Sequence, residues 1–153
     1  MSVQRALDRL RRDPDYVRNI AAWERLPARL ARCAPFPAAL DGALVETLRR
    51  LGISSLYTHQ AAAVEAALNG QNVVVATSTA SGKTLCYNLP VLQAFTGDPQ
   101  ARALYLFPTK ALAQDQATAL AELVRALDAD IPVRTYDGDT PSRRRPAIRR
   151  EHG

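Results

Sequence analysis

Long apolar runs and internal repeats are missing from this chain of 153 residues. Apolar stretches such as VVVA and NLPVL are the size of core elements, whereas a membrane-spanning helix needs about 20 apolar residues. The N-terminal stretch MSVQRALDRLRRDPD alternates charged with apolar residues and lacks the apolar centre of a secretory signal. With 47% hydrophobic and 23% charged residues, the composition predicts a globular protein with no membrane partner.

Cysteine is also scarce. Cys33 and Cys86 are the two cysteines, and neither belongs to a C-x-x-C motif or has a histidine nearby in the sequence. This usage predicts structural thiols in a reduced, cytoplasmic setting, rather than a disulfide framework or a metal site.

Lysine is nearly absent among the basic residues. The 20 basic residues exceed the 15 acidic ones, and the net charge of +5 favours a polyanionic partner. Lys83 and Lys110 are the only lysines, and the other basic residues are arginines. Both lysines fall in segments that are candidates for phosphate contact; the alternative is chance placement of two residues.

Apolar residues recur with helical spacing in the first 70 residues, which predicts three helices. These helices cover residues 2–12, 38–51 and 58–69. Gly52 and Gly70 follow the second and third helices and are typical helix stops. Between the first and second helices, a segment with four prolines is expected to pack as short helices around Trp23 and Leu26.

From residue 72 onwards, β-branched runs alternate with helical stretches. The expected strands cover residues 72–76, 101–107 and 131–136. A helix is expected after each strand: one bent near Pro90, one over 109–127, and a last one that Thr140 caps and Pro141 begins. This alternation predicts a doubly wound α/β fold with a parallel sheet and flanking helices.

The segment NVVVATSTASGKTLCYNLPVL, residues 72–92, lacks one residue of the usual phosphate-binding pattern G-x-x-x-x-G-K-[ST], because Thr77 stands where the first glycine is expected. That position only starts the turn, so a small residue with ordinary dihedrals can serve. Gly82 lets the backbone approach a phosphate, Lys83 reaches the β- and γ-phosphates, and the Thr84 hydroxyl can hold Mg²⁺. Because a strand precedes the loop and a helix follows it, we interpret it as a nucleotide site; the alternative is a Ser/Thr-rich connection.

Four stretches together resemble the first motor domain of superfamily 2 helicases: TSTASGKT followed by LCYNLPVL, with LYTHQ upstream and FPTKALAQDQ downstream. The resemblance is greatest to the DEAD/DEAH-box branch that includes DNA helicases of the mitomycin repair factor A type, where the loop also reads T-x-T-A-S-G-K-T. It implies a RecA-like P-loop NTPase fold with an incomplete parallel sheet and flanking helices. A helical N-terminal extension would cover residues 1–50, and the N-terminal part of the helicase ATP-binding domain would cover 51–153.

The resemblance also implies the nucleotide-binding residues. Gln60 in LYTHQ matches the glutamine that reads adenine, and its carboxamide offers the donor and the acceptor that adenine requires. Taken alone, Gln60 would be a polar residue near a helix start. ATP and Mg²⁺ are the implied cofactors, with Lys83 and Thr84 in catalytic roles and Thr84 on the metal. The implied ATP-binding residues are Tyr57, Gln60, Thr79, Ala80, Ser81, Gly82, Lys83 and Thr84.

Pro108, Thr109 and Lys110 match the family's motif Ia, which contacts the backbone of a single strand. A hydroxyl and an ammonium at a helix N-terminus suit phosphate, although an ordinary strand-to-helix turn is the alternative. Gly138 in YDGDT resembles a second strand-contacting loop. The expected partner is nucleic acid, which the family suggests is single-stranded DNA. The arginines at 143–145, 149 and 150 could add attraction, but a solvated helix face is equally consistent.

Two family features are absent from the sequence. No D-E-x-H box follows Thr84, and the second motor domain with its arginine fingers is missing. We therefore expect the N-terminal portion of an ATP-dependent DNA helicase, an ATP hydrolase that works in DNA repair. By itself this portion should be inactive and should leave sheet edges unpaired. The alternatives are a nucleotide-binding switch module and a truncated product without helicase activity.

Overall fold

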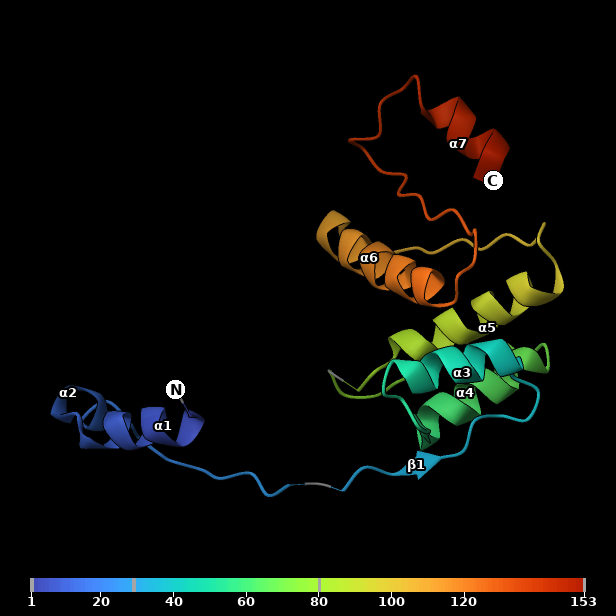
Figure 1. Cartoon of the computed structure of the whole chain (residues 1–153). Coiled ribbons are helices and arrows are strands. Elements are labelled where there is room, and N and C mark those ends of the chain that lie inside the picture. The colour runs from blue at the N-terminus through green and yellow to red at the C-terminus, as the bar shows by residue number, and fades with distance from the viewer. Residues whose placement is uncertain (1, 29, 80, 153) are drawn as a thin grey trace. The chain divides into compact units, whose positions relative to one another are not determined.

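Residues 2–28, 30–79 and 81–152 are described by a computed structural model of the chain, drawn in Figure 1. The chain forms two compact units, Met1–Ala31 and Arg32–Gly153. The domain boundary expected after residue 50 stays a prediction.

The first unit contains two helices, α1 (Val3–Arg12) and α2 (Pro14–Val17), and α1 confirms the helix predicted over 2–12. Ser2 caps α1, because its hydroxyl accepts a hydrogen bond from the amide of Arg5 at 3.4 Å. Neither helix contains a buried residue, so neither forms a core of its own.

The expected packing of short helices around Trp23 and Leu26 is wrong. After α2, the described residues up to 28 form no helix, and Leu26 is 85% exposed. The guanidinium of Arg11 lies 4.5 Å from the centroid of the Trp23 ring, so a cation–π contact takes the place of an apolar cluster. Pro27 lacks an amide hydrogen and disfavours a helical residue before it, which explains why the segment stays irregular.

The second unit contains a small antiparallel pair of strands, β1 (Cys33–Ala34) and β2 (Leu56–Tyr57). Cys33 lies opposite Tyr57, and Ala34 lies opposite Leu56. Two residues are too few to produce a periodic signal, so the sequence did not predict this pair. The pairing anchors the backbone immediately before α4.

Two helices of this unit, α3 (Gly42–Arg50) and α4 (Thr58–Leu68), form where helices were predicted, although α3 begins four residues late. Asp41 explains the late start, because its carboxylate accepts from the amide of Ala43 at 2.7 Å and caps α3. Gly52 and Gly70 follow the two helices with φ angles of +82° and +74°, which confirms both as helix stops.

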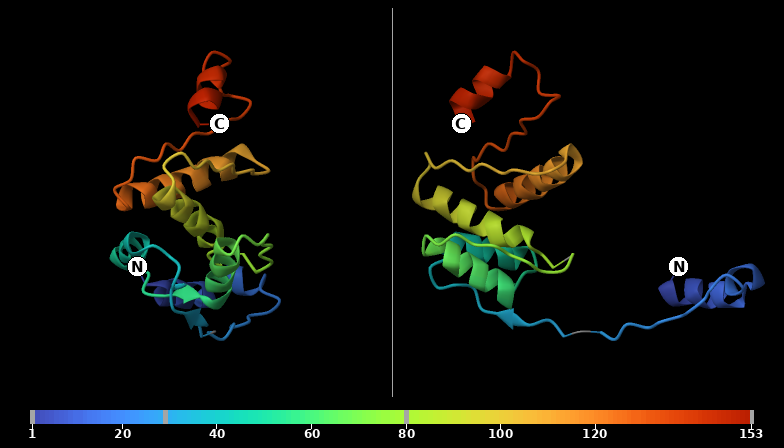
Figure 2. Two further views of the ribbon diagram at one scale, coloured as in Figure 1. Left: turned by 90° about the vertical axis from the view of Figure 1, so that its right-hand side faces the viewer. Right: turned by 180° about the vertical axis from the view of Figure 1, so that it is seen from behind.

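The remaining helices are α5 (Thr84–Gly97), α6 (Lys110–Ala126) and α7 (Arg145–His152), and α5 continues through Pro90. Figures 1 and 2 show α3 and α4 packed against α5, with α6 on another side of α5. Aliphatic side chains from these helices and their flanks form the core. The buried members are Leu40, Leu44, Leu48, Leu56, Ala61, Val64, Leu89, Leu92, Leu120 and Val124.

The segments predicted as strands do not pair with one another. Within the described parts of the chain, β1 and β2 form the only sheet, so the expected parallel sheet is not observed and stays a prediction. Three of the apolar side chains in these segments are strongly exposed: Val74 (94%), Leu104 (84%) and Leu106 (83%). This exposure agrees with the expectation of unpaired sheet edges.

The prediction that Thr140 caps the last helix and that Pro141 begins it is wrong, because α7 begins at Arg145. The Thr140 hydroxyl instead accepts a hydrogen bond from the amide of Asp137 at 2.9 Å. The side chain that could have capped a helix therefore closes the turn before it.

Candidate nucleotide and nucleic-acid site

The phosphate loop lies directly before the N-terminus of α5, as predicted. Gly82 has a φ of +73°, a conformation that other residues rarely adopt, so the need for glycine here is confirmed. Thr77 has no positive φ, because Asp128 is the one non-glycine residue with a positive φ in the part of the chain that the structure describes. The missing first glycine is therefore compatible with the backbone.

The ammonium group of Lys83 lies against oxygen atoms of the loop. Its Nζ donates to the carbonyl oxygen of Ser78 at 2.6 Å and to that of Thr77 at 3.1 Å. The hydroxyls of Thr77 and Ser81 are joined by a 2.6 Å hydrogen bond, and Ser81 Oγ lies 3.3 Å from Lys83 Nζ. A phosphate bound to the loop would compete with these oxygens for the ammonium.

Thr79 and Ala80 were also predicted to bind ATP. Thr79 is exposed, and Ala80 lies outside the described residues. Their roles in ATP binding stay predictions.

Thr84 is the first residue of α5, so its hydroxyl lies at the positive end of the helix dipole. Thr84 Oγ1 donates to Gln116 Oε1 at 3.2 Å, and the Tyr87 hydroxyl donates to the same oxygen at 2.6 Å. Gln116 belongs to α6, so the predicted Mg²⁺ ligand contacts the helix that begins at Lys110. Sequence reasoning missed Tyr87 and Gln116; the second glutamine of ALAQDQ was the available signal.

Gln60 is 3% exposed and lies in the first turn of α4. Its Nε2 donates to the carbonyl oxygen of Gly82 at 2.7 Å, and its Oε1 accepts from the amide of Tyr57 at 2.8 Å. The second bond satisfies a free amide at the helix start. The predicted adenine-reading side chain thus holds the phosphate loop, and contact with adenine would require it to exchange these partners.

Two neighbours of Gln60 also face the loop. His59 Nε2 lies 3.0 Å from the carbonyl oxygen of Ser81, and the rings of Tyr57 and His59 stack with centroids 5.8 Å apart. Tyr57 is 42% exposed, so part of its ring is accessible to a planar ligand. Sequence reasoning missed His59, although its position in LYTHQ places it one residue before Gln60.

The two segments predicted to contact a nucleic-acid strand meet in the structure. Lys110 Nζ lies 2.6 Å from Asp139 Oδ2, and 3.6 Å from the position that a Cβ on Gly138 would take. The hydrogen bond to Asp139 is the main cause that raises the pKa of Lys110. The Thr109 hydroxyl caps α6, and Pro108 is exposed directly before it.

Arg145 holds the loop that contains Gly138. Its guanidinium donates to the carbonyl oxygens of Thr140 at 3.0 Å, Asp137 at 3.1 Å and Gly138 at 3.4 Å. It also lies 5.5 Å from the centroid of the Tyr136 ring. Arg145 is half-buried, whereas the other arginines considered as a basic surface are exposed: Arg143, Arg144, Arg149 and Arg150. The arginine-dense stretch was a signal, but which arginine reaches the loop depends on tertiary structure.

A second polar contact joins α5 to the segment 101–107. The Tyr105 hydroxyl donates to Asn88 Oδ1 at 3.0 Å, and the rings of Tyr87 and Tyr105 meet edge to face with centroids 5.7 Å apart. Burial, with a smaller effect of the Tyr87 phenol, raises the pKa of Tyr105 to about 12. Asn88 Nδ2 is buried without a hydrogen-bond partner among the residues that the structure describes.

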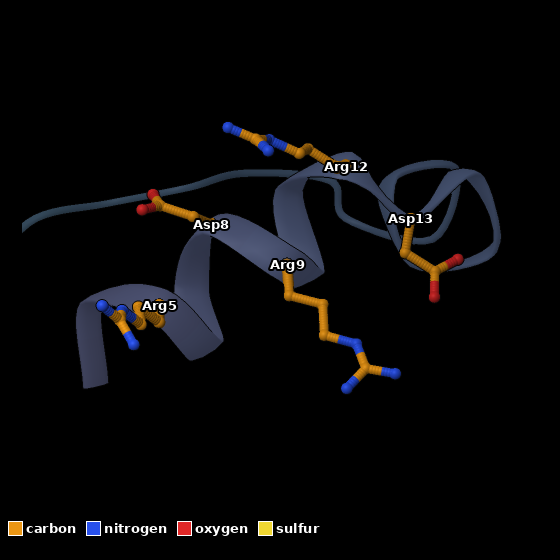
Figure 3. Close-up of a pocket in the computed structure, with 5 residues that line it drawn as sticks. All are labelled: Arg5, Asp8, Arg9, Arg12 and Asp13. Carbon is orange, nitrogen blue, oxygen red and sulfur yellow. The ribbon is translucent and has the colours of Figure 1, made fainter. Parts of the chain in front are cut away.

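The first unit has an open depression on α1 that does not form a site. Its five lining side chains are drawn in Figure 3, where their charged ends point in different directions. They are Arg5, Asp8, Arg9, Arg12 and Asp13. Across residues 2–28, 30–79 and 81–152, no three His, Cys, Asp or Glu side chains cluster so as to hold a metal ion. No helix in these ranges has the length and apolarity that a bilayer crossing needs.

Known proteins are similar to this chain in sequence and in fold. Residues 57–152 match the DEAD/DEAH box helicase family. The uncharacterized ATP-dependent helicase YprA of Bacillus subtilis is 48% identical over 133 residues, which cover 87% of this chain and 17% of that protein. The ATP-dependent helicase hrq1 of Schizosaccharomyces pombe is 36% identical over 152 residues, which cover 96% of this chain and 14% of that protein.

A solved structure shows the same fold. The crystal structure of the DUF1998 helicase MrfA bound to DNA and AMPPNP matches 97% of this chain with a TM-score of 0.81 and 43% identity, and the match covers 20% of that chain. This chain therefore spans no more than a fifth of the length of these three relatives. The family match covers most of the second unit, including the phosphate loop, and so the chain belongs to the DEAD/DEAH box helicase family.

Proposed function

We propose that this chain supplies the ATP-binding and nucleic-acid-binding surface of an ATP-dependent DNA helicase, an ATP hydrolase. The phosphate loop is the observation that carries the proposal. It combines Gly82 at positive φ, the Lys83 ammonium among loop oxygens and Thr84 at the N-terminus of α5. Backbone amides, an ammonium and a helix N-terminus together favour bound phosphate.

The residues fit Mg-ATP. Lys83 can exchange its carbonyl partners for phosphate oxygens, and Thr84 offers Mg²⁺ a neutral hydroxyl oxygen. When bound, Mg²⁺ supplies positive charge that offsets the charge of the phosphates. Gln60 would read adenine with its carboxamide, and the accessible ring of Tyr57 would lie beside the base.

The proposed nucleic-acid surface consists of Pro108, Thr109 and Lys110 together with Gly138. The convergence of Lys110 and Gly138 supports it, because one strand backbone could contact both segments. The MrfA structure, which contains DNA, supports DNA as the class of nucleic acid. We extend this to single-stranded DNA.

Four further features belong to the same proposal. They are a parallel sheet over 72–76, 101–107 and 131–136, a domain boundary after residue 50, a cytoplasmic setting and a role in DNA repair. The β-branched and apolar runs in these segments support the sheet, because strands of a parallel sheet are normally apolar on both faces. Two free cysteines support a reducing compartment.

Lys83→Ala in the intact protein that carries this chain tests the proposal. Titration with a fluorescent ATP analogue and Mg²⁺ should show affinity reduced about tenfold or more, because a charged hydrogen-bond donor to phosphate is lost. Lys110→Ala is the matched control, since it removes the other lysine and should leave nucleotide affinity unchanged. Equal affinity in wild type and Lys83→Ala would exclude the nucleotide-site assignment.

A further inference from the structure

One hydrogen bond joins the two halves of the proposed site. Thr84 begins α5 at the nucleotide end, whereas Gln116 lies in α6, whose first residue is Lys110. Gln116 Oε1 accepts from Thr84 Oγ1 at 3.2 Å and from the Tyr87 hydroxyl at 2.6 Å. All three side chains of this cluster are half-buried, so their bonds are partly shielded from water.

The direction of the bond determines what the Thr84 hydroxyl can do. A carboxamide oxygen only accepts hydrogen bonds, so Thr84 gives its proton to Gln116. The lone pairs of Thr84 Oγ1 then point away from Gln116. The Tyr87 hydroxyl lies 3.5 Å from this oxygen, a long contact that still leaves it a lone pair for a cation, because Mg²⁺ binds a neutral hydroxyl through its oxygen. Partners behind a metal ligand commonly fix its orientation in this way.

We infer that Gln116 is a positioning residue that orients the Thr84 hydroxyl for Mg²⁺ and links this ligand to the strand-contacting end of α6. The inference rests on the proposed function. Lys110 and Gln116 lie on the same helix, about 9 Å apart along its axis at 1.5 Å per residue. A displacement of the start of α6 by a bound strand therefore reaches Gln116 without an intervening loop.

Gln114 provides a matched control. It is the same residue type on the same helix, but it is exposed and lines a groove on another side of α6 together with Val133 and Ile148. Gln114→Leu and Gln116→Leu thus make the same chemical change, but only Gln116→Leu removes the contact with Thr84. Gln116→Glu keeps an acceptor oxygen at the same reach and serves as the conservative variant.

The first measurement is the affinity of the intact protein for a fluorescent ATP analogue, once with excess Mg²⁺ and once with EDTA. Gln116→Leu should weaken binding about fivefold with Mg²⁺ and leave binding in EDTA unchanged, because only metal ligation uses the oriented hydroxyl. Thr84→Ala should show the same pattern with a loss at least as large, because it removes the ligand itself, and the double variant should lose no more than Thr84→Ala alone. Gln116→Glu should keep the Mg²⁺-dependent part of the nucleotide affinity close to that of the wild type.

The second measurement adds a saturating single-stranded oligonucleotide. In the wild type the oligonucleotide should change Mg-nucleotide affinity, and in Gln116→Leu this change should shrink towards none. The affinity of Gln116→Leu for the oligonucleotide without nucleotide should equal that of the wild type. Gln114→Leu should behave like the wild type in both measurements.

Three outcomes overturn the inference: wild-type Mg²⁺ dependence in Gln116→Leu, an equal loss with and without Mg²⁺, or the same loss in Gln114→Leu. If Gln116→Leu does not fold, Gln116→Glu and Thr84→Ala test the same bond, and a difference in EDTA between Thr84→Ala and wild type contradicts the inference. If the wild type binds no nucleotide, the proposed function is overturned together with this inference. If Lys83→Ala abolishes nucleotide binding but Gln116→Leu binds like the wild type, only this inference is overturned.

Discussion

Lys110 Nζ and Asp139 Oδ2 lie 2.6 Å apart, so the lysine proposed to contact a strand phosphate is paired with a carboxylate of the second proposed strand-contacting loop. Both side chains are largely exposed, at 56% and 79%, so the pair adds little to the stability of the fold. Asp139 and a phosphate would bind the same ammonium. We therefore expect the pair to affect nucleic-acid affinity more than folding.

Asp139→Asn should strengthen binding of single-stranded DNA about two- to fivefold at low salt, because Lys110 no longer exchanges a carboxylate for phosphate. Fluorescence anisotropy with a labelled oligonucleotide measures the change. Asp115→Asn is the control, since it removes the same charge from an exposed carboxylate of α6 outside the pair.

Lys110→Ala should act in the opposite direction. It should weaken DNA binding and reduce the log–log salt slope by about 0.7, the value for one phosphate contact on a single strand. Binding like that of the wild type across a salt series would show that Lys110 makes no contact with the nucleic acid.

Gly82→Ala should abolish most nucleotide binding. An L-residue at φ +73° costs about 1 kcal/mol or more, and the added Cβ would lie 2.5 Å from Gln60 Nε2. Because Gln60 is buried, its side chain could move only by breaking its bond to the Gly82 carbonyl. Gly97→Ala is the control, because a Cβ added at Gly97 would have no neighbour within 4 Å and its φ is not positive, so this variant should bind the ATP analogue normally. Wild-type binding by Gly82→Ala would contradict the loop geometry.

Gln60→Glu should loosen the phosphate loop and reduce the preference for adenine. The variant keeps the acceptor for the Tyr57 amide but loses the donor to the Gly82 carbonyl and places negative charge beside it. The ratio of ATP to GTP affinity should fall several-fold, whereas Gln71→Glu, the same change at an exposed position, should leave it unchanged. An unaltered ratio in Gln60→Glu would argue against adenine reading.

Tyr105 should make stability sensitive to alkaline pH. Burial raises its pKa from 10.0 to about 12 in the folded state, so the folded chain holds this proton more tightly than the unfolded chain. The contribution of Tyr105 to the free energy of unfolding is fully present below pH 10 and is lost as the pH rises towards 12. Urea unfolding at pH 9 to 11 should show a shallower decline for Tyr105→Phe than for wild type; parallel declines would exclude Tyr105 as the group.

Local patterns were sufficient for α3, α4, α5 and α6 of the second unit. Leu44 and Leu48 recur on one face of α3 and are buried, and Gly52 and Gly70 end helices because glycine adopts the required positive φ without strain. The Thr140 cap failed because the hydroxyl had a closer partner in Asp137, and side-chain competition of this kind is not visible in periodicity. Strand pairing is non-local, so an apolar run such as 101–107 indicates a strand without specifying its neighbour.

The candidate site shows the same contrast between residues that local patterns predict and residues that depend on tertiary contacts. The motif residues Gly82, Lys83 and Thr84 could be predicted from the sequence because their proposed chemistry depends on adjacent positions. The partner of Thr84 could not, since Gln116 reaches it from α6, 32 residues later in the sequence, where no pattern applies. Arg145 was not singled out either, because which arginine holds the Gly138 loop depends on the fold.

The short strand pair offers a practical way to observe the proposed adenine end of the site. Cys33 is exposed and lies opposite Tyr57, whereas Cys86 is buried in α5, and burial raises the pKa of its thiol. Because the thiolate is the reactive form, a maleimide dye at neutral pH should attach to Cys33 well before Cys86. A fluorophore attached to Cys33 would therefore lie opposite Tyr57 in the β1–β2 pair. Its emission should change when a nucleotide base binds beside Tyr57.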